Sequence, residues 1–436
     1  MTRRTVLCTL IAVLAIVGAS CSEPEDTSSS DTGDTAAETV ECSAEQLEQC
    51  ARESSIADLV PDEPVAADGE PFRIGMVNQE NTPAGSFPEL SQAVQAAIEY
   101  VNAELGGLDG RPLELEVCNT EFSAEGSTAC GQRFVEADMP VVLGGIDVFG
   151  NAIDVLADNE VPYAGGIPIS TQSVQAENSY QWSGGSWGAA VAFADHASKE
   201  LDAERVAVVY GEFGSITEAA EYARTVLERN GVETQLVPYP IVATDLVSPM
   251  QAAASTDPDA IFVLAADTSC KAGFEAITTL GLDAQKYFVG ACAAPTIIDS
   301  VDPASTEGTI FNVEGPISRT SPEPDPDFTL YEGVLAEYSD GLDPVGAGTV
   351  SFRAFMNLYT VLRELGADGA TPAAITEALA AKVDAPSYMG HPYTCDRQQF
   401  EGLPAMCSPQ QILGRMEDGD LQQLGSWYDV GAIYAG

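Results

Sequence analysis

The feature that most constrains this chain is a strand, a helix and a second strand in residues 72–117. Residues 72–77 form a short apolar run that ends in a polar cluster, which is typical of a buried strand. Apolar residues recur at helical spacing over residues 90–105, and a Gly-Gly pair ends that pattern. Alternating apolar and acidic residues at 113–117 predict the second strand. A β-α-β unit of this kind predicts a parallel sheet with a right-handed crossover.

The start of the helix is marked by three residues. Ser86 and Glu89 have the spacing of a capping box, and Pro88 falls in the first turn. The polar loop at residues 78–86 follows the first strand. Because ligands of parallel sheets bind beyond the carboxyl ends of the strands, we expect this loop at a binding site.

Alternation of strands and helices continues in two series, residues 124–166 and 189–313, which predicts two α/β lobes. A proline-rich connection at residues 315–328 follows, and then three further helices. Residues 415–422 predict a hairpin around Asp-Gly. The expected fold class is α/β, with two Rossmann-like lobes built on parallel sheets.

Composition excludes some partners. The chain has 67 acidic and 18 basic residues among 436, a formal net charge of −49. Such a surface repels nucleic acid and anionic lipid head groups. With two histidines, the chain has too few for most imidazole-based metal sites, so we expect neither a metal nor another cofactor.

The N-terminus predicts export. Two arginines precede an apolar run at residues 6–17 that is too short to span a bilayer. The Gly-Ala-Ser-Cys that ends at Cys21 resembles a bacterial lipobox, whose cysteine becomes the lipidated first residue. Gly18 departs from the usual leucine, so ordinary signal cleavage stays open. We expect a signal peptide at residues 1–21 and a protein outside the cytoplasm, tethered through Cys21 to the outer face of the cell membrane.

Residues 22–60 are expected to form a flexible acidic stalk, because residues 22–40 are almost all Ser, Thr, Asp, Glu and Ala. Residues 44–49 have helical character. On one continuous helix Cys42 and Cys50 would lie roughly 12 Å apart, too far for a disulfide. Either that helix is interrupted, or these two cysteines have other partners.

The cysteine count suggests disulfides. Beyond Cys8 in the signal peptide and Cys21, an even number remains, which in an exported chain indicates four disulfides. Zinc is the alternative, but no pair has the short spacing of a zinc knuckle. Connectivity does not follow from sequence, and pairing in chain order is the simplest proposal. The cysteines concerned are Cys42, Cys50, Cys118, Cys130, Cys270, Cys292, Cys395 and Cys407.

The order of the predicted elements and several short sequence motifs resemble those of a known family. Residues 73–75 (RIG) lie at the start of the first strand. The most specific motif is at residues 102–113 (NAELGGLDGRPL). Val142-Leu143-Gly144-Gly145 and the ending at residues 416–419 add support. The chain resembles the type I periplasmic binding proteins, in particular the branched-chain amino-acid-binding proteins of ATP-driven (ABC) importers, over residues 70–436.

The resemblance implies two lobes that are joined by three crossing strands and that close on a small ligand. Lobe 1 would comprise residues 70–183 and 317–390, and lobe 2 residues 184–316 and 391–436. The partners implied are a small-molecule ligand, an ABC permease and, through the lipid, the membrane. We expect a monomer.

Carried over by position, the family's contacts fall on strand-end loops of both lobes. Amino-acid binders usually have a small hydroxyl residue where this chain has Asp147, no threonine aligns at Gly165 and Gly166, and residues 291–293 lack the acid that would bind an ammonium group. The predicted ligand-binding residues are Gln79, Glu80, Asp147, Phe149, Gly166, Phe213 and Asp267.

Most of these residues also have an ordinary structural interpretation. Phe213 either stacks on a ligand or caps the sheet. Asp147 and Asp267 either hold a cationic group or end strands and cap helices. Glu80 and Glu212 are alternatively exposed loop charges. Trp182 and Trp187, which flank the first expected crossing, line the cleft or pack between the lobes, and Gly166 admits a ligand or serves a turn.

The functional expectation is a solute-binding lipoprotein for a small polar ligand, such as an amino acid or an amide. A ligand-sensing ectodomain of a membrane signalling partner would share the fold. A secreted hydrolase is a further alternative. The sequence has no Gly-x-Ser-x-Gly elbow, Gly-x-Gly-x-x-Gly loop or phosphate loop, so we do not expect an enzyme.

Overall fold

The computed structural model describes residues 42–82, 85–241, 243–265, 267–315 and 325–436. The predicted signal peptide, the lipid site at Cys21 and residues 22–41 of the predicted stalk lie outside these residues. Within the described residues, we find no helix that is both long and apolar enough to cross a membrane.

The first sheet contains the predicted β-α-β unit. Its order is β2-β1-β3-β4-β5, and every adjacent pair is parallel. Phe72 lies opposite Leu113, and Asn78 opposite Asn119, so β1 and β2 end together. The strands are β1 (Phe72–Asn78), β2 (Leu113–Asn119), β3 (Val142–Gly144), β4 (Tyr163–Ala164) and β5 (Ser179–Tyr180).

Helix α2 (Pro88–Glu104) connects β1 to β2. Its apolar stripe is buried as predicted, including Leu90 and Val101. The predicted capping box is wrong: the N-cap is Phe87, without a side-chain cap, and the Ser86 hydroxyl instead accepts a hydrogen bond from the Asn81 amide at 2.9 Å. This hydrogen bond engages the Ser86 hydroxyl with the loop instead of with the amides of the first helical turn.

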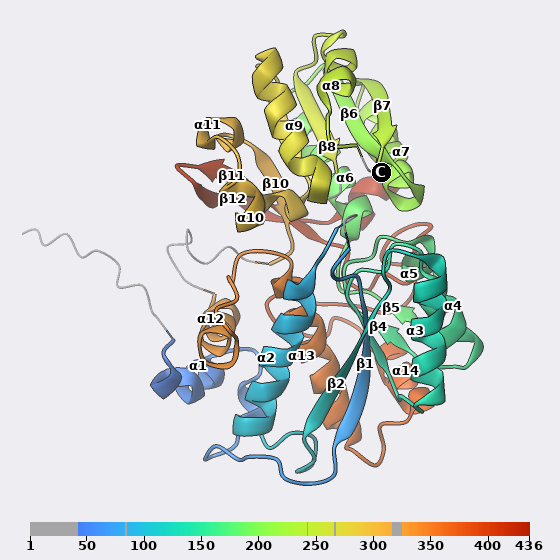
Figure 1. Ribbon diagram of the computed structural model, residues 1–436, viewed down its shortest axis with the longest axis vertical. Helices are drawn as coiled ribbons and strands as arrows, with labels where there is room; N and C mark the ends of the chain where they lie inside the picture. The colour runs from blue at the N-terminus through green and yellow to red at the C-terminus, as the bar shows by residue number, and fades with distance from the viewer. Residues whose placement is uncertain (1–41, 83–84, 242, 266, 316–324) are drawn as a thin grey trace, which may run out of the picture. The chain divides into compact units, whose positions relative to one another are not determined.

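Helices cover both faces of this sheet (Figure 1). Helices α2 and α13 (Gly348–Leu365) pack side by side on one face, and α3 (Ala124–Glu136) and α4 (Asn151–Asp158) on the other. Helices α12 (Pro326–Tyr338) and α14 (Pro372–Ala380) extend the layer of α13, and α5 (Thr171–Gln175) lies near β5.

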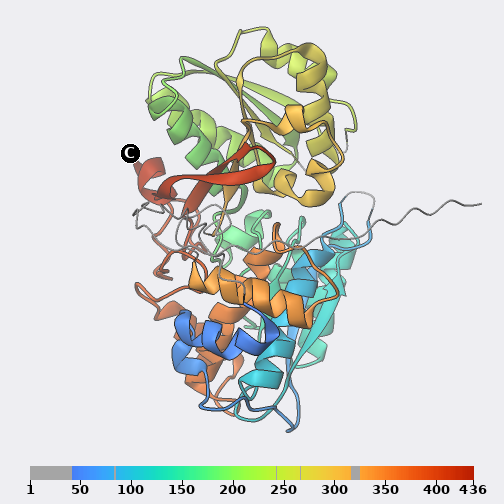
Figure 2. The same ribbon diagram turned by 90° about the vertical axis from the view of Figure 1, so that its left-hand side faces the viewer.

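The second sheet has the order β12-β11-β10-β9-β8-β6-β7. Its neighbours from β6 to β10 are parallel, whereas β11 is antiparallel to both β10 and β12. The predicted hairpin is confirmed, with Glu417 opposite Asp420 across the Asp-Gly turn (red in Figure 2). The strands are β6 (Arg205–Glu212), β7 (Glu233–Pro240), β8 (Ala260–Leu264), β9 (Gln285–Phe288), β10 (Ile310–Val313), β11 (Gln411–Glu417) and β12 (Asp420–Tyr428).

A hydrophobic core lies on each face of this second sheet. Helices α6 (Gly185–Lys199) and α7 (Gly214–Arg229) bury one face, and α8 (Val247–Ala254) and α9 (Asp267–Leu280) bury the other. Four short helices complete the lobe: η3 (Gly290–Ala293), α10 (Pro295–Ile298), α11 (Pro303–Thr306) and α15 (Val430–Ala435). The predicted fold class, two α/β lobes with parallel sheets, is therefore confirmed.

The N-terminal segment corrects the predicted stalk. Residues 44–59 form η1 (Ala44–Gln46), α1 (Leu47–Glu53) and η2 (Ala57–Leu59), and α1 packs against α12. Leu47 and Ile56 join the core of the first lobe. The prediction of a flexible stalk is therefore wrong for residues 42–60, because a few apolar side chains suffice to pack this segment on the lobe.

All four disulfides pair in chain order. Cys42 joins Cys50 with their Cα atoms 6.3 Å apart, because α1 starts at Leu47 and no continuous helix separates the two cysteines. The remaining bonds are Cys118–Cys130, Cys270–Cys292 and Cys395–Cys407.

The chain passes between the sheets three times: after β5, after β10 and before β11. The first and third passages lie side by side, since Gln181 forms a parallel bridge with Met406. Trp182 packs edge-on against Tyr393 at 5.7 Å. The residue bounds expected for the two lobes stay a prediction.

Candidate functional site

A cavity of about 990 Å³ lies beyond the carboxyl ends of the parallel strands, where such sheets place their ligands. Residues of both lobes line it. Gln79 follows β1 and Ile146 follows β3 in the first lobe, whereas Phe213 follows β6 and Val289 follows β9 in the second. A molecule in this cavity would touch both lobes at once.

The cavity wall is largely apolar, as in small-molecule sites generally. The loops after β3 and β4 contribute branched side chains, and the second lobe contributes small and branched ones. These lining residues are Ile146, Val148, Ile167, Ile169, Ala189, Ile216, Ile241, Ala265, Val289, Ala293 and Ala294.

Three phenylalanines form a continuous aromatic group across the lobes. Phe149 meets Phe122 at 5.5 Å and Phe213 at 5.9 Å between ring centroids, both edge to face. Phe122 and Phe213 line the cavity, whereas Phe149, a predicted ligand-binding residue, contacts both rings but is not among the lining residues. Phe213 thus takes the position predicted from sequence, on the lobe 2 side of the cavity.

Two bulky lining residues have strained backbones. Phe122 has a φ of 51° and Met389 a φ of 49°, in the left-handed region that disfavours large side chains. Such strain gathers at sites where a side chain must be aimed at a ligand. Neither residue was predicted, because a sequence gives no sign of a positive φ at a phenylalanine or a methionine.

Gln79 lines the cavity as predicted. Its side chain is buried, and Nε2 donates to the Gly85 carbonyl oxygen at 3.1 Å. Because that carbonyl oxygen can only accept, the amide nitrogen must face it, and this fixes the amide orientation. The Oε1 atom has no hydrogen-bond partner among the described residues.

Asp147 belongs to the loop after β3 but does not line the cavity. Its carboxylate accepts from Ser127 Oγ at 2.7 Å and from the Phe149 amide at 3.3 Å. Burial raises the pKa of this carboxyl, and the hydrogen bonds from Ser127 and the backbone oppose the shift. The geometry matches the structural alternative for Asp147, since it ties α3 to the start of α4.

The remaining predicted residues lie around the cavity but not in its lining. Glu80 Oε1 accepts from Asn78 Nδ2 at 2.9 Å and from Ser91 Oγ at 2.6 Å, so it anchors the first turn of α2. A Cβ on Gly166 would lie 2.6 Å from the Gly144 backbone, so this glycine serves strand packing. Asp267 begins α9, and its side chain lies outside the described part of the chain.

Both tryptophans at the first crossing are buried in the cores, Trp182 in the first lobe and Trp187 in the second. They pack rather than line the cavity.

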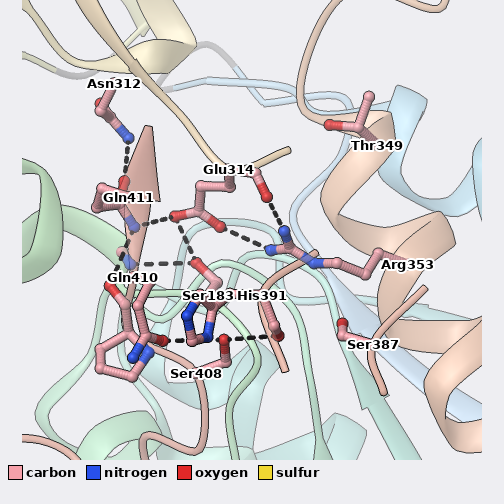
Figure 3. A network of polar contacts seen from close by, with 12 residues as sticks. Ser183, Asn312, Glu314, Thr349, Arg353, Ser387, His391, Ser408, Gln410 and Gln411 are labelled. Carbon is pink, nitrogen blue, oxygen red and sulfur yellow. Dashed lines mark hydrogen bonds and ion pairs between the residues drawn. The ribbon is translucent and has the colours of Figure 1, made fainter. Parts of the chain in front are cut away.

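Sequence reasoning missed a polar network at the edge of the cavity (Figure 3). Glu314 follows β10, and its Oε1 accepts from Ser183 Oγ at 2.8 Å and from Gln411 Nε2 at 3.1 Å. Its Oε2 pairs with Arg353 Nη2 at 2.9 Å. Ser183 and Gln411 belong to the first and third crossings. One carboxylate therefore contacts all three passages between the lobes and helix α13.

Arg353 also holds the backbone of this network, since Nη1 donates to the Glu314 carbonyl oxygen. Burial lowers the pKa of the guanidinium, and the adjacent Glu314 opposes that shift. The signal available in the sequence was an arginine in the mostly apolar stretch of residues 350–362.

Comparison with known proteins decides the family. Residues 71–401, well over half of the chain, match the family described as periplasmic binding protein. The chain belongs to this family. The type I resemblance seen in the sequence is thereby confirmed. No curated protein matches the chain.

Solved structures agree on the fold. A leucine-binding protein from Thermotoga maritima has a TM-score of 0.66 at 15% identity, covering 81% of this chain and 98% of its own. A possible leucine/isoleucine/valine-binding protein from Rhodopirellula baltica has a TM-score of 0.72 at 13% identity, covering 84% and 98%. A solute-binding protein of an ABC transporter from Rhodopseudomonas palustris, in complex with p-hydroxybenzoic acid, has a TM-score of 0.67 at 16% identity, covering 84% and 99%.

Proposed function

We propose that this protein is an extracytoplasmic solute-binding lipoprotein that captures a small molecule by lobe closure and presents it to an ABC importer. The observation that carries the proposal is the cavity whose wall comes from both lobes. A ligand there stabilises the closed state by its differential affinity for that state. The ligand has a polar, amide-like group, as expected from sequence, and an apolar body that matches the wall.

The experiment is a thermal-shift screen of the purified protein with amino acids, amides and aromatic compounds, followed by small-angle X-ray scattering with each hit. A ligand should raise the melting temperature and reduce the radius of gyration. Compounds that bind without reducing the radius of gyration would contradict lobe closure. If no compound of a broad panel raised the melting temperature, solute capture would be contradicted.

The tether is tested separately. Cys21→Ala should abolish labelling by a fatty-acid analogue and release the protein from the membrane fraction. Retention of Cys21→Ala at the membrane would contradict the lipid anchor. Pull-down of a permease by the ligand-bound protein supports import, whereas capture of a signalling receptor would favour the sensing alternative.

A further inference from the structure

The N-terminal segment, residues 42–60, precedes the part of the chain that matches the family, residues 71–401. It is nevertheless built into the first lobe. Its α1 packs against α12, so closely that a Cβ added at Gly333 of α12 would lie 2.8 Å from Cys42 Sγ. Ile56 is 3% exposed and belongs to the core of this lobe. The segment is therefore a packed addition to the matched region.

Asp327, in the first turn of α12, joins this segment to a distant loop. Its Oδ1 accepts a hydrogen bond from the Ser55 amide at 2.7 Å, and its Oδ2 accepts one from the Met389 amide at 2.6 Å. Its main-chain carbonyl oxygen accepts from the Tyr388 hydroxyl at 2.7 Å. The residue is 7% exposed, so water competes little for these bonds. One buried carboxylate thus holds the backbone at two positions, 272 and 62 residues away.

The loop at residues 387–390 lies against the second passage between the sheets (Figure 3). A Cβ added at Gly315, on that passage, would lie 3.0 Å from the Met389 carbonyl oxygen. A Cβ added at Gly390 would lie 2.9 Å from Arg353 Cδ. The loop is therefore packed against the network that holds the three crossings, and its position limits where that network can lie.

Met389 has a backbone conformation that must be held in place. Its φ of 49° lies in the left-handed region, which disfavours large side chains. Such a conformation persists only where the surrounding structure imposes it. Asp327 constrains the Met389 amide, and Asn357 Oδ1 constrains the neighbouring Tyr388 amide at 2.8 Å. Loss of the Asp327 acceptor would allow the loop to relax towards ordinary backbone angles.

From these contacts we infer that Asp327 is a positioning residue for lobe closure. Through Met389 it couples the packing of the N-terminal segment to the second passage, and thereby to the arrangement of the two lobes. The coupling follows a continuous series of hydrogen bonds and packed atoms. The inference rests on the proposed function, because it concerns the lobe closure on which that function depends.

Two acids at the start of α12 provide a matched pair of variants. Asp327→Asn keeps the size of the side chain but leaves one acceptor oxygen for two amide donors. Asp325→Asn removes the same charge from the residue that caps the helix. Hydrogen exchange followed by mass spectrometry should be at least about tenfold faster at the Met389 amide in Asp327→Asn, the effect of losing one charge-assisted hydrogen bond. In Asp325→Asn it should keep the rate of the parent.

A second pair of variants loosens the N-terminal segment itself. Ile56→Ala removes core atoms from this segment and leaves the Asp327 carboxylate in place. Ile74→Ala removes the same atoms from the same core, but on β1. If the two ends of the series are coupled, Ile56→Ala should also speed exchange at the Met389 amide, whereas Ile74→Ala should not.

The arrangement of the lobes is measured in the ligand-free protein. Gln132→Cys on α3 and Gln251→Cys on α8 place one spin label on an exposed position of each lobe. Double electron–electron resonance then gives the distribution of distances between the labels. Asp327→Asn and Ile56→Ala should shift or broaden this distribution, and the two control variants should keep that of the parent. A residue that only stabilised the first lobe would not change it.

The inference is overturned if Asp327→Asn and Asp325→Asn change the distances equally, or if Ile56→Ala leaves the Met389 amide and the distances as in the parent. Faster exchange at Met389 with unchanged distances would also overturn it, because Asp327 would then act within the first lobe alone. No ligand enters these measurements, so each of these results leaves solute capture to be decided by the thermal-shift screen. Conversely, a panel without a single binder would contradict the proposed function and leave the measured coupling in place.

Discussion

Arg353 on α13 and Glu314 after β10 form a buried ion pair, with Nη2 and Oε2 2.9 Å apart and side chains 4% and 8% exposed. The pair connects the helical layer of the first lobe to a crossing segment that leads out of the second. Because Glu314 also accepts from Ser183 and Gln411, its carboxylate fixes the relative positions of the three crossings.

Breaking this pair should destabilise the protein strongly. Arg353→Met or Glu314→Gln alone should each lower the free energy of unfolding by about 3–5 kcal/mol, because one partner is left uncompensated in the interior. The double variant should lose much less than the sum, as coupled sites do. Denaturant unfolding of the four proteins measures this.

A surface pair provides the control for that cycle. Lys382 Nζ and Glu364 Oε2 lie 2.6 Å apart, but the Glu364 side chain is 51% exposed. Glu364→Gln should cost less than about 1 kcal/mol. Similar losses for Glu364→Gln and Glu314→Gln would mean that the buried pair is solvated in solution.

The disulfide from β2 to α3 should contribute measurable stability. Replacing both Cys118 and Cys130 by alanine opens a loop with a sequence separation of 12. The chain-entropy model gives a loss of about 3 kcal/mol. Peptide mapping without reductant should recover the Cys118–Cys130 bond from the native protein, and an unchanged unfolding curve in the variant would show that the bond is dispensable.

Two glycines with nearly equal backbone angles should respond differently to alanine. Gly166 has a φ of 90° and its added Cβ would lie 2.6 Å from the Gly144 backbone, whereas Gly419 has a φ of 88° and open space around it. Gly419→Ala should cost about 1–2 kcal/mol from backbone strain alone. Gly166→Ala should cost about 1–3 kcal/mol more because of the steric clash. Equal melting temperatures for the two variants would contradict this packing.

His196 should make stability depend on pH. Burial lowers its pKa below the usual value of 6.5, with a further contribution from Arg415, while Glu200 and Asp195 oppose the shift; its Nδ1 lies 2.8 Å from the Tyr287 hydroxyl. Below pH 6.5 the unfolded chain takes up a proton that the folded protein resists. Stability is therefore complete above pH 6.5 and falls as the pH drops towards the lowered value.

The fall is at most about 1.4 kcal/mol per pH unit for one proton. His196→Gln should remove this component from unfolding curves recorded between pH 7 and 5. His391→Gln, at the other histidine of the chain, serves as the control. If the two variants keep the same slope as the parent, other groups cause the dependence.

Local features were predictable from sequence, and features that join distant segments were not. The β-α-β unit and the Asp-Gly hairpin follow from periodicity and turn chemistry within a few residues. Phe213 was placed correctly because a strand-end position is enough to reach the cavity. Asp147 has the same kind of position, but its side chain turns to Ser127, and sequence does not specify that direction. Glu314 contacts Ser183, 131 residues away, and Gln411, 97 residues away, and no local pattern reveals such contacts.

The position of Phe149 has a consequence for how affinity can evolve. This ring contacts Phe213 of the other lobe without lining the cavity. It therefore favours the arrangement of the lobes in which this contact forms, whether or not a ligand is present. Apparent affinity scales with the fraction of molecules already competent to bind. Substitutions at Phe149 would thus tune the solute concentration at which the protein loads while leaving the choice of solute to the residues that touch it.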